Sequence, residues 1–137
     1  AGIEVSSVPE RYRINGLKRA DLVIKHSRNG KFRHVIEFKR GVKASNLLKD
    51  AERLAWLCSN VDLGHKMEKN FLVTVTTYGE KVLDKKTEAI SAMLEKSFPY
   101  VSLRAEYVDL TDFHSTGANS FGKPLHAMVW QFHYKQD

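Results

Sequence analysis

Three runs of β-branched and apolar residues, with one amphipathic segment among them, limit how the first half of the chain can fold. The runs cover residues 20–25, 34–39 and 71–76, and the amphipathic segment covers 46–58. The first two runs flank a polar stretch with Asn29-Gly30 at its centre, which is typical of a β-hairpin. A hairpin followed by a helical crossover into another strand predicts a mixed sheet.

The 71–76 run is nearly continuous in its apolar character, which is the pattern of a central strand buried on both faces. The remaining predicted elements are a short strand at 11–14, a second amphipathic helix at 83–97, and strands at 101–110 and 127–134 on either side of a Gly- and Ser-rich loop at 114–124. The order β-ββ-α-β-α-β-β predicts an α/β fold with a mixed central sheet flanked by helices. We expect a single domain over 1–137.

The two amphipathic segments also predict which residues form the core. Ser45 is a candidate cap for the first helix. Charged side chains occupy the face opposite its apolar stripe and are expected to be solvated: Lys49, Asp50, Glu52 and Arg53. The predicted inward positions are Leu47, Leu48, Ala51, Leu54, Ala55 and Cys58 in the first helix and Leu83, Ile90, Met93 and Leu94 in the second, and Trp56 and Trp130 are expected in the core.

The single cysteine, Cys58, excludes an intrachain disulfide and a cysteine cluster for zinc. Charged residues interrupt every hydrophobic stretch well short of the roughly 20 apolar residues that a membrane helix needs. We therefore expect a cytoplasmic protein without a membrane partner. The start at Ala1 also fits a domain taken from a larger parent, such as a secreted toxin with a neutralising partner.

The positive charge is concentrated in the first part of the chain. Residues 1–53 hold 13 basic and 6 acidic side chains, whereas residues 54–137 hold 9 basic and 10 acidic side chains. An excess of this kind favours a polyanionic partner such as nucleic acid, and an ordinary solvated surface is the alternative.

Charged residues stand inside the predicted hairpin, where a buried sheet would disfavour them. Glu37 and Lys39 are two apart on one strand and therefore share a face. A two-residue Asn29-Gly30 turn would point Asp21 away from Glu37. A three-residue loop of residues 28–30 with a bulge at Gly30 pairs positions whose numbers sum to 58, which sets Asp21 opposite Glu37. We predict this second register.

Two carboxylates placed so closely repel each other unless a cation lies between them. Oxygen ligands without His or Cys favour Mg²⁺ or Mn²⁺. The Lys39 ammonium beside them is suited to orienting a water or stabilising charge on a phosphate. The structural alternative is an exposed sheet edge with a cross-strand ion pair.

The segments Arg19-Ala20-Asp21-Leu22-Val23-Ile24 and Val35-Ile36-Glu37-Phe38-Lys39-Arg40, followed by a helix and an apolar strand, resemble the PD-(D/E)XK nuclease superfamily over residues 10–77. The resemblance implies a restriction-endonuclease-like fold in which Asp21, Glu37 and the Phe38 carbonyl hold the metal and Lys39 acts on the attacking water. It also implies an accessory carboxylate, for which Glu10 is the first candidate and Glu4 the second. Ala20 replaces the usual Pro, and no clear helix precedes the hairpin.

From these features we predict a Mg²⁺- or Mn²⁺-dependent nuclease, with DNA favoured over RNA and endonuclease action favoured. The alternative is an inactive module of the same fold that binds nucleic acid or a protein partner. A homodimer is compatible with either function. The predicted nucleic-acid contacts are Arg19, Arg28, Lys31, Arg40 and Lys43. Lys43 and Asp50, near the start of the first predicted helix, are candidates to touch the phosphate or order the site, and a solvated helix position is the favoured alternative for each.

Overall fold

The computed structural model describes residues 21–25, 27–28, 32–40, 44–59, 69–116 and 121–135. Five strands form one mixed sheet in the order β1-β2-β3-β5-β4, and β2 and β3 are its only parallel pair in this part of the chain. The strand predicted at 11–14 lies outside the described residues. The elements are β1 (Leu22–Lys25), β2 (Phe32–Arg40), α1 (Ala44–Ser59), β3 (Lys69–Thr76), α2 (Glu80–Ser97), β4 (Val101–His114) and β5 (Pro124–Tyr134).

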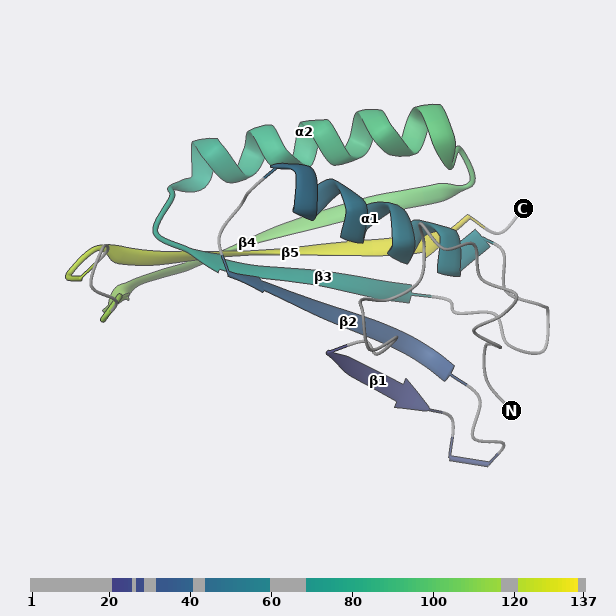
Figure 1. Ribbon diagram of the computed structural model, residues 1–137, viewed down its shortest axis with the longest axis horizontal. Coiled ribbons are helices and arrows are strands. Elements are labelled where there is room, and N and C mark those ends of the chain that lie inside the picture. The colour runs from purple at the N-terminus through teal and green to yellow at the C-terminus, as the bar shows by residue number, and fades with distance from the viewer. Residues whose placement is uncertain are drawn as a thin grey trace.

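Both described helices lie on the same face of the sheet, which gives a two-layer α/β arrangement (Figure 1). The apolar stripe of each helix faces the sheet, and Leu54 in α1 and Leu83 and Ile90 in α2 are fully buried. Trp130 and Phe132 of β5 fill the space under the helices. The Trp130 indole N–H donates to Thr87 Oγ1 at 2.8 Å, which ties β5 to α2. The predicted α/β class and most of the predicted core are therefore confirmed, with Leu48, Trp56 and Met93 only partly buried at its edge.

The central strand β3 is buried on one face, so the expectation of burial on both faces is wrong. Asn70, Leu72 and Thr74 point under the helices and are buried, whereas Val75 on the other face is 42% exposed. The physical reason is that both described helices cover the same side of the sheet. The predicted central position of β3 is correct.

The last two strands are longer than predicted, because β4 continues to His114 and β5 begins at Pro124, the two ends of the predicted loop. The α2 helix begins earlier than predicted, at Glu80 after Gly79, and places an acidic side chain in its first turn, where the helix dipole favours it. Within the described part of the chain, no helix is long and apolar enough to cross a membrane.

Candidate functional site

The β1–β2 hairpin has the register that the carboxylate pair requires. Leu22 pairs with Ile36 and Ile24 with His34, so paired positions sum to 58 as predicted. A register irregularity lies between Ile24 and Lys25. Asn29 and Gly30 lie outside the described residues.

Asp21 lies directly before β1, and the register places it opposite Glu37. Its Oδ2 accepts the Phe38 backbone N–H at 2.7 Å. The N–H and C=O of one strand residue point to the same side of the strand, so the Phe38 carbonyl also points toward the Asp21 side of β2. Asp21, Glu37 and the Phe38 backbone are thus brought together, as the sequence predicts.

Glu37 is a buried acid beside a second acid. Its side chain is 7% exposed. Burial, the hydrogen bond with Asp21 and the charge of Asp21 together raise the pKa of Glu37 to about 7, against the smaller opposing effects of Arg53 and Lys39. Among the described residues, no group donates a hydrogen bond to Glu37 Oε1. The site therefore holds a buried carboxylate oxygen for which a cation is the natural partner.

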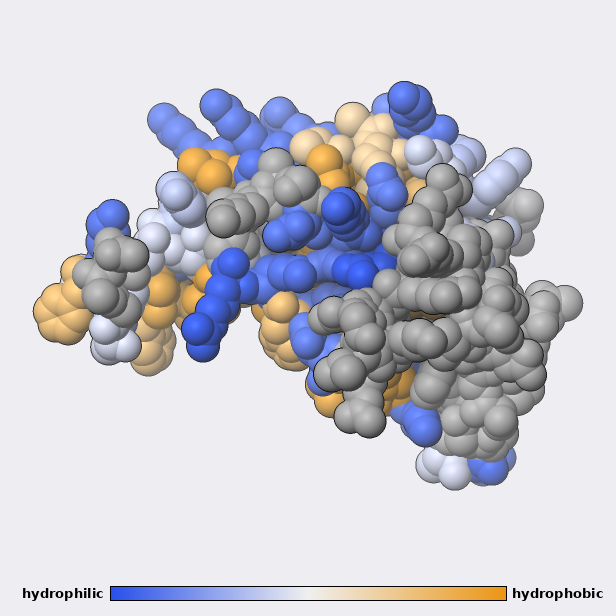
Figure 2. Space-filling model, viewed as in Figure 1, coloured by the Kyte–Doolittle hydropathy of each residue, from blue (hydrophilic) through white to orange (hydrophobic). Residues whose placement is uncertain are grey.

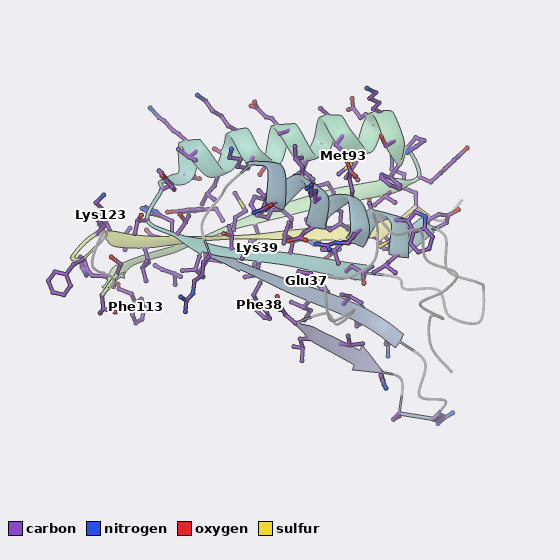
Figure 3. The ribbon with its side chains drawn as sticks, viewed as in Figure 1. Glu37, Phe38, Lys39, Met93, Phe113 and Lys123 are labelled. Atoms are coloured by element: carbon purple, nitrogen blue, oxygen red, sulfur yellow. The ribbon has the colours of Figure 1, made fainter. Side chains whose placement is uncertain are left out.

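Lys39 lies on the same face as Glu37, between β2 and α1, whereas Phe38 points to the opposite face (Figure 3). The Lys39 Nζ forms an ion pair with Asp50 Oδ2 at 2.7 Å. Arg53 of α1 pairs with the same carboxylate. In Figure 2, hydrophilic side chains gather between α1 and the sheet on this side of the molecule.

Asp50 is only 1% exposed, so its predicted place on the solvated face of the helix is wrong. The sequence held a signal for this, because Asp50 is three residues after Leu47 and four before Leu54, and these spacings share one helix face. Its burial is explained by the two cations, Lys39 and Arg53, that contact it.

The other predicted contact residues are placed as follows. Arg28 and Arg40 are exposed. Arg40 follows Lys39 on β2 and therefore points to the opposite face. Glu10, Arg19, Lys31 and Lys43, together with Glu4, lie outside the described residues.

The oxygen donors at the site fit a hard divalent cation. Two carboxylates in contact, one of them with a buried oxygen that lacks a donor, together with the adjacent Phe38 carbonyl, match the ligands that Mg²⁺ and Mn²⁺ prefer. In the described ranges no group of three or more His, Cys, Asp or Glu side chains could hold a metal ion. Among the described residues, the oxygen ligands available to a cation are the two carboxylates and the Phe38 carbonyl.

No protein-family model, curated protein or solved structure matches this chain.

Proposed function

We propose that this protein is a metal-dependent phosphodiesterase that cleaves nucleic acid, with DNA as the favoured substrate and endonuclease action favoured. The observation that carries the proposal is the contact between the Asp21 and Glu37 carboxylates, with Lys39 on the same face of the same strand as Glu37. Asp21 is exposed and Glu37 is buried. Like charges placed together where one of them is buried cost stability and are typical of a position where a cation or a proton is used.

Asp21, Glu37 and the Phe38 carbonyl are the residues that would hold Mg²⁺ or Mn²⁺. The metal would supply a Lewis acid for the phosphate and lower the pKa of a bound water. Lys39 is two residues after Glu37 on β2, so their backbone positions are roughly 6.6 Å apart along the strand. The Lys39 ammonium is suited to holding the attacking water or to neutralising charge on the phosphate. The burial of Glu37 strengthens each of these electrostatic interactions.

Two further features support a restriction-endonuclease-like nuclease. The order of an Asp before β1, Glu-x-Lys on β2, the α1 crossover and a parallel β3 is the arrangement that the resemblance implies. The net charge of +7 over residues 1–53, counted from 13 basic and 6 acidic side chains, favours association with phosphate.

The ion pair between Lys39 and buried Asp50 favours a second candidate, an inactive module that uses this cluster only to attach α1 to the sheet. In that case the chain would bind nucleic acid through its basic residues without hydrolysing it. The two candidates differ in their need for a divalent cation.

The test is a cleavage assay on supercoiled plasmid, single-stranded DNA and single-stranded RNA in Mg²⁺, Mn²⁺ or EDTA. Glu37→Gln and Lys39→Gln are compared with Glu106→Gln on β4 and Lys85→Gln on α2, which change the same chemical groups at exposed positions. We expect metal-dependent cleavage that falls by about 100-fold or more in the two site variants and is unchanged in the controls. Cleavage that persists in Glu37→Gln, or no cleavage by the unaltered chain, would contradict the proposal.

A further inference from the structure

We propose that Asp50 is the positioning residue for Lys39, so that an acid on α1 fixes the cation that acts at the carboxylate pair on β2. The inference rests on the proposed function and extends it to a residue outside the Glu-x-Lys strand. Its basis is the 2.7 Å ion pair between Lys39 Nζ and Asp50 Oδ2, in which the carboxylate is 1% exposed and the lysine side chain 33% exposed.

The packing of α1 on β2 explains why Asp50 meets Lys39. The helix follows β2 directly in the chain and packs back over the sheet (Figure 1). Two residues along the strand span about 6.6 Å, and three residues along the helix span about 4.5 Å. Two helix residues that are three positions apart can therefore lie opposite two strand residues that are two positions apart. Asp50 contacts Lys39, and Arg53 is close enough for its charge to act on Glu37.

The energetics favour a positioning role for the buried carboxylate. A buried ion pair is weak evidence for stability, since well-packed apolar residues often replace one without loss. A lysine side chain, by contrast, has substantial rotamer entropy, which it would retain if nothing held its ammonium group in place. The contact with Asp50 fixes the direction of the Lys39 side chain before substrate arrives. An ammonium has three donors, so Lys39 can hold its ion pair with Asp50 and still donate to a water or a phosphate oxygen.

Arg53 completes the arrangement by contacting Asp50 from the same helix. Burial lowers the pKa of the Arg53 guanidinium, while the negative charge of Glu37 opposes that shift. The two cations therefore share one buried acid, and the carboxylate does not depend on Lys39 alone for its charge balance. For this reason we expect Asp50 to keep its ion pair with Arg53 in a Lys39 variant.

The test is a double-mutant cycle on kcat, with Lys39→Gln, Asp50→Asn and the double variant measured at saturating Mn²⁺ on the substrate that the unaltered chain cleaves best. Asp84→Asn, at an exposed position on α2, is the matched control. If Asp50 acts through Lys39, Asp50→Asn lowers kcat by about 10- to 100-fold alone and by less than about 2-fold in the Lys39→Gln background. KM stays within about 3-fold, and Asp84→Asn has no effect.

Asp50→Asn leaves Arg53 beside a neutral amide and can lower the folded fraction, so the cycle is repeated with Asp50→Glu, which keeps the charge but displaces the carboxylate. The same non-additivity is expected, with a smaller loss in kcat. Multiplicative losses in both cycles would overturn the positioning role while leaving the nuclease proposal intact. If the unaltered chain cleaves no substrate in Mg²⁺ or Mn²⁺, the proposed function fails and this inference fails with it.

Discussion

Glu37 is a carboxylate that folding moves out of water and next to a second carboxylate, Asp21. Both effects favour the protonated acid, and they raise the pKa of Glu37 from 4.5 to about 7. The folded chain therefore binds a proton more tightly than the unfolded chain between these two pH values. A protein that kept this arrangement without using it would lose stability at neutral pH for no gain.

This difference predicts how stability depends on pH. The contribution of Glu37 is fully present below pH 4.5 and is lost as the pH rises to about 7. At 1.36 kcal/mol per pKa unit, the free energy of unfolding falls by about 3 kcal/mol over this window because of Glu37 alone. Urea unfolding in EDTA at pH 4.5 and pH 8 measures the change.

Glu37→Gln should remove that pH dependence and make the chain more stable than the unaltered protein at pH 8, because the amide donates a hydrogen bond to Asp21 where a carboxylate repels it. Glu106→Gln on the exposed part of β4 is the control and should leave the pH dependence unchanged. A loss of stability at pH 8 in Glu37→Gln would show that the carboxylate is favourably paired in the folded chain.

Divalent cations should reverse the same destabilisation. Mn²⁺ at about ten times its dissociation constant stabilises by about 1.4 kcal/mol, which raises the Tm by about 3 to 8 °C for a domain of this size. The rise should be absent in Asp21→Asn and Glu37→Gln and retained in Asp84→Asn. Thermal unfolding followed by circular dichroism, with and without Mn²⁺, measures it. An equal rise in all four proteins would place the binding site elsewhere.

The carboxylate pair was predictable from the sequence only once a hairpin register was chosen, because the turn allowed two registers. Positions 22–24 adopt the predicted register, in which paired positions sum to 58, and Asp21 then lies opposite Glu37. The buried position of Asp50 was harder to predict, since an acid next to Lys49 and Glu52 is typical of a solvated face. Its two partners, Lys39 and Arg53, become visible only when α1 is packed on β2.

Asn70 joins three elements at the start of β3. Its Oδ1 accepts the Val35 N–H of β2 at 2.8 Å, and its Nδ2 donates to the Leu54 carbonyl of α1 at 3.1 Å. The same Nδ2 also lies 3.2 Å from Cys58 Sγ. The side chain is 0% exposed, so water cannot replace these contacts. Asn70 therefore helps to hold α1 over the strand that carries Glu37.

Asn70→Ala should lower the free energy of unfolding by about 2 to 4 kcal/mol, because it leaves a buried N–H without an acceptor and opens a small cavity. Asn46→Ala on the exposed side of α1 is the control and should change stability by less than about 0.5 kcal/mol. Urea unfolding at pH 7 compares the two. A change below about 1 kcal/mol in Asn70→Ala would mean that the neighbouring backbone finds other partners.

The number of sheet faces covered by helices could not be predicted from the sequence pattern. A run such as 71–76 indicates a central strand, but it does not specify how many of its faces helices cover. In the described part of the chain the face opposite the helices carries apolar side chains, with Phe38 53% exposed and Val75 42% exposed. The side chains of both residues follow the strand alternation, so the face to which they point was predictable. Their exposure to solvent was not predictable.

The distribution of charge predicts how the whole chain associates with nucleic acid. Because the net charge of +7 belongs to residues 1–53, we expect affinity for a labelled DNA duplex to fall steeply as salt rises from 50 to 200 mM. In EDTA, Glu37→Gln should bind at least as tightly as the unaltered chain, since it removes a negative charge. Fluorescence anisotropy measures both effects. Affinity that does not change with salt would exclude phosphate contacts as its main source.

The claim that Asp21 and Glu37 form a cation site is tested most directly by isothermal titration of Mn²⁺ into the chain at pH 8, with Glu37→Gln and Glu106→Gln titrated in parallel. We predict one saturable site in the unaltered chain and in Glu106→Gln, and none in Glu37→Gln. Saturable binding that survives in Glu37→Gln, or no binding to the unaltered chain, would contradict the assignment.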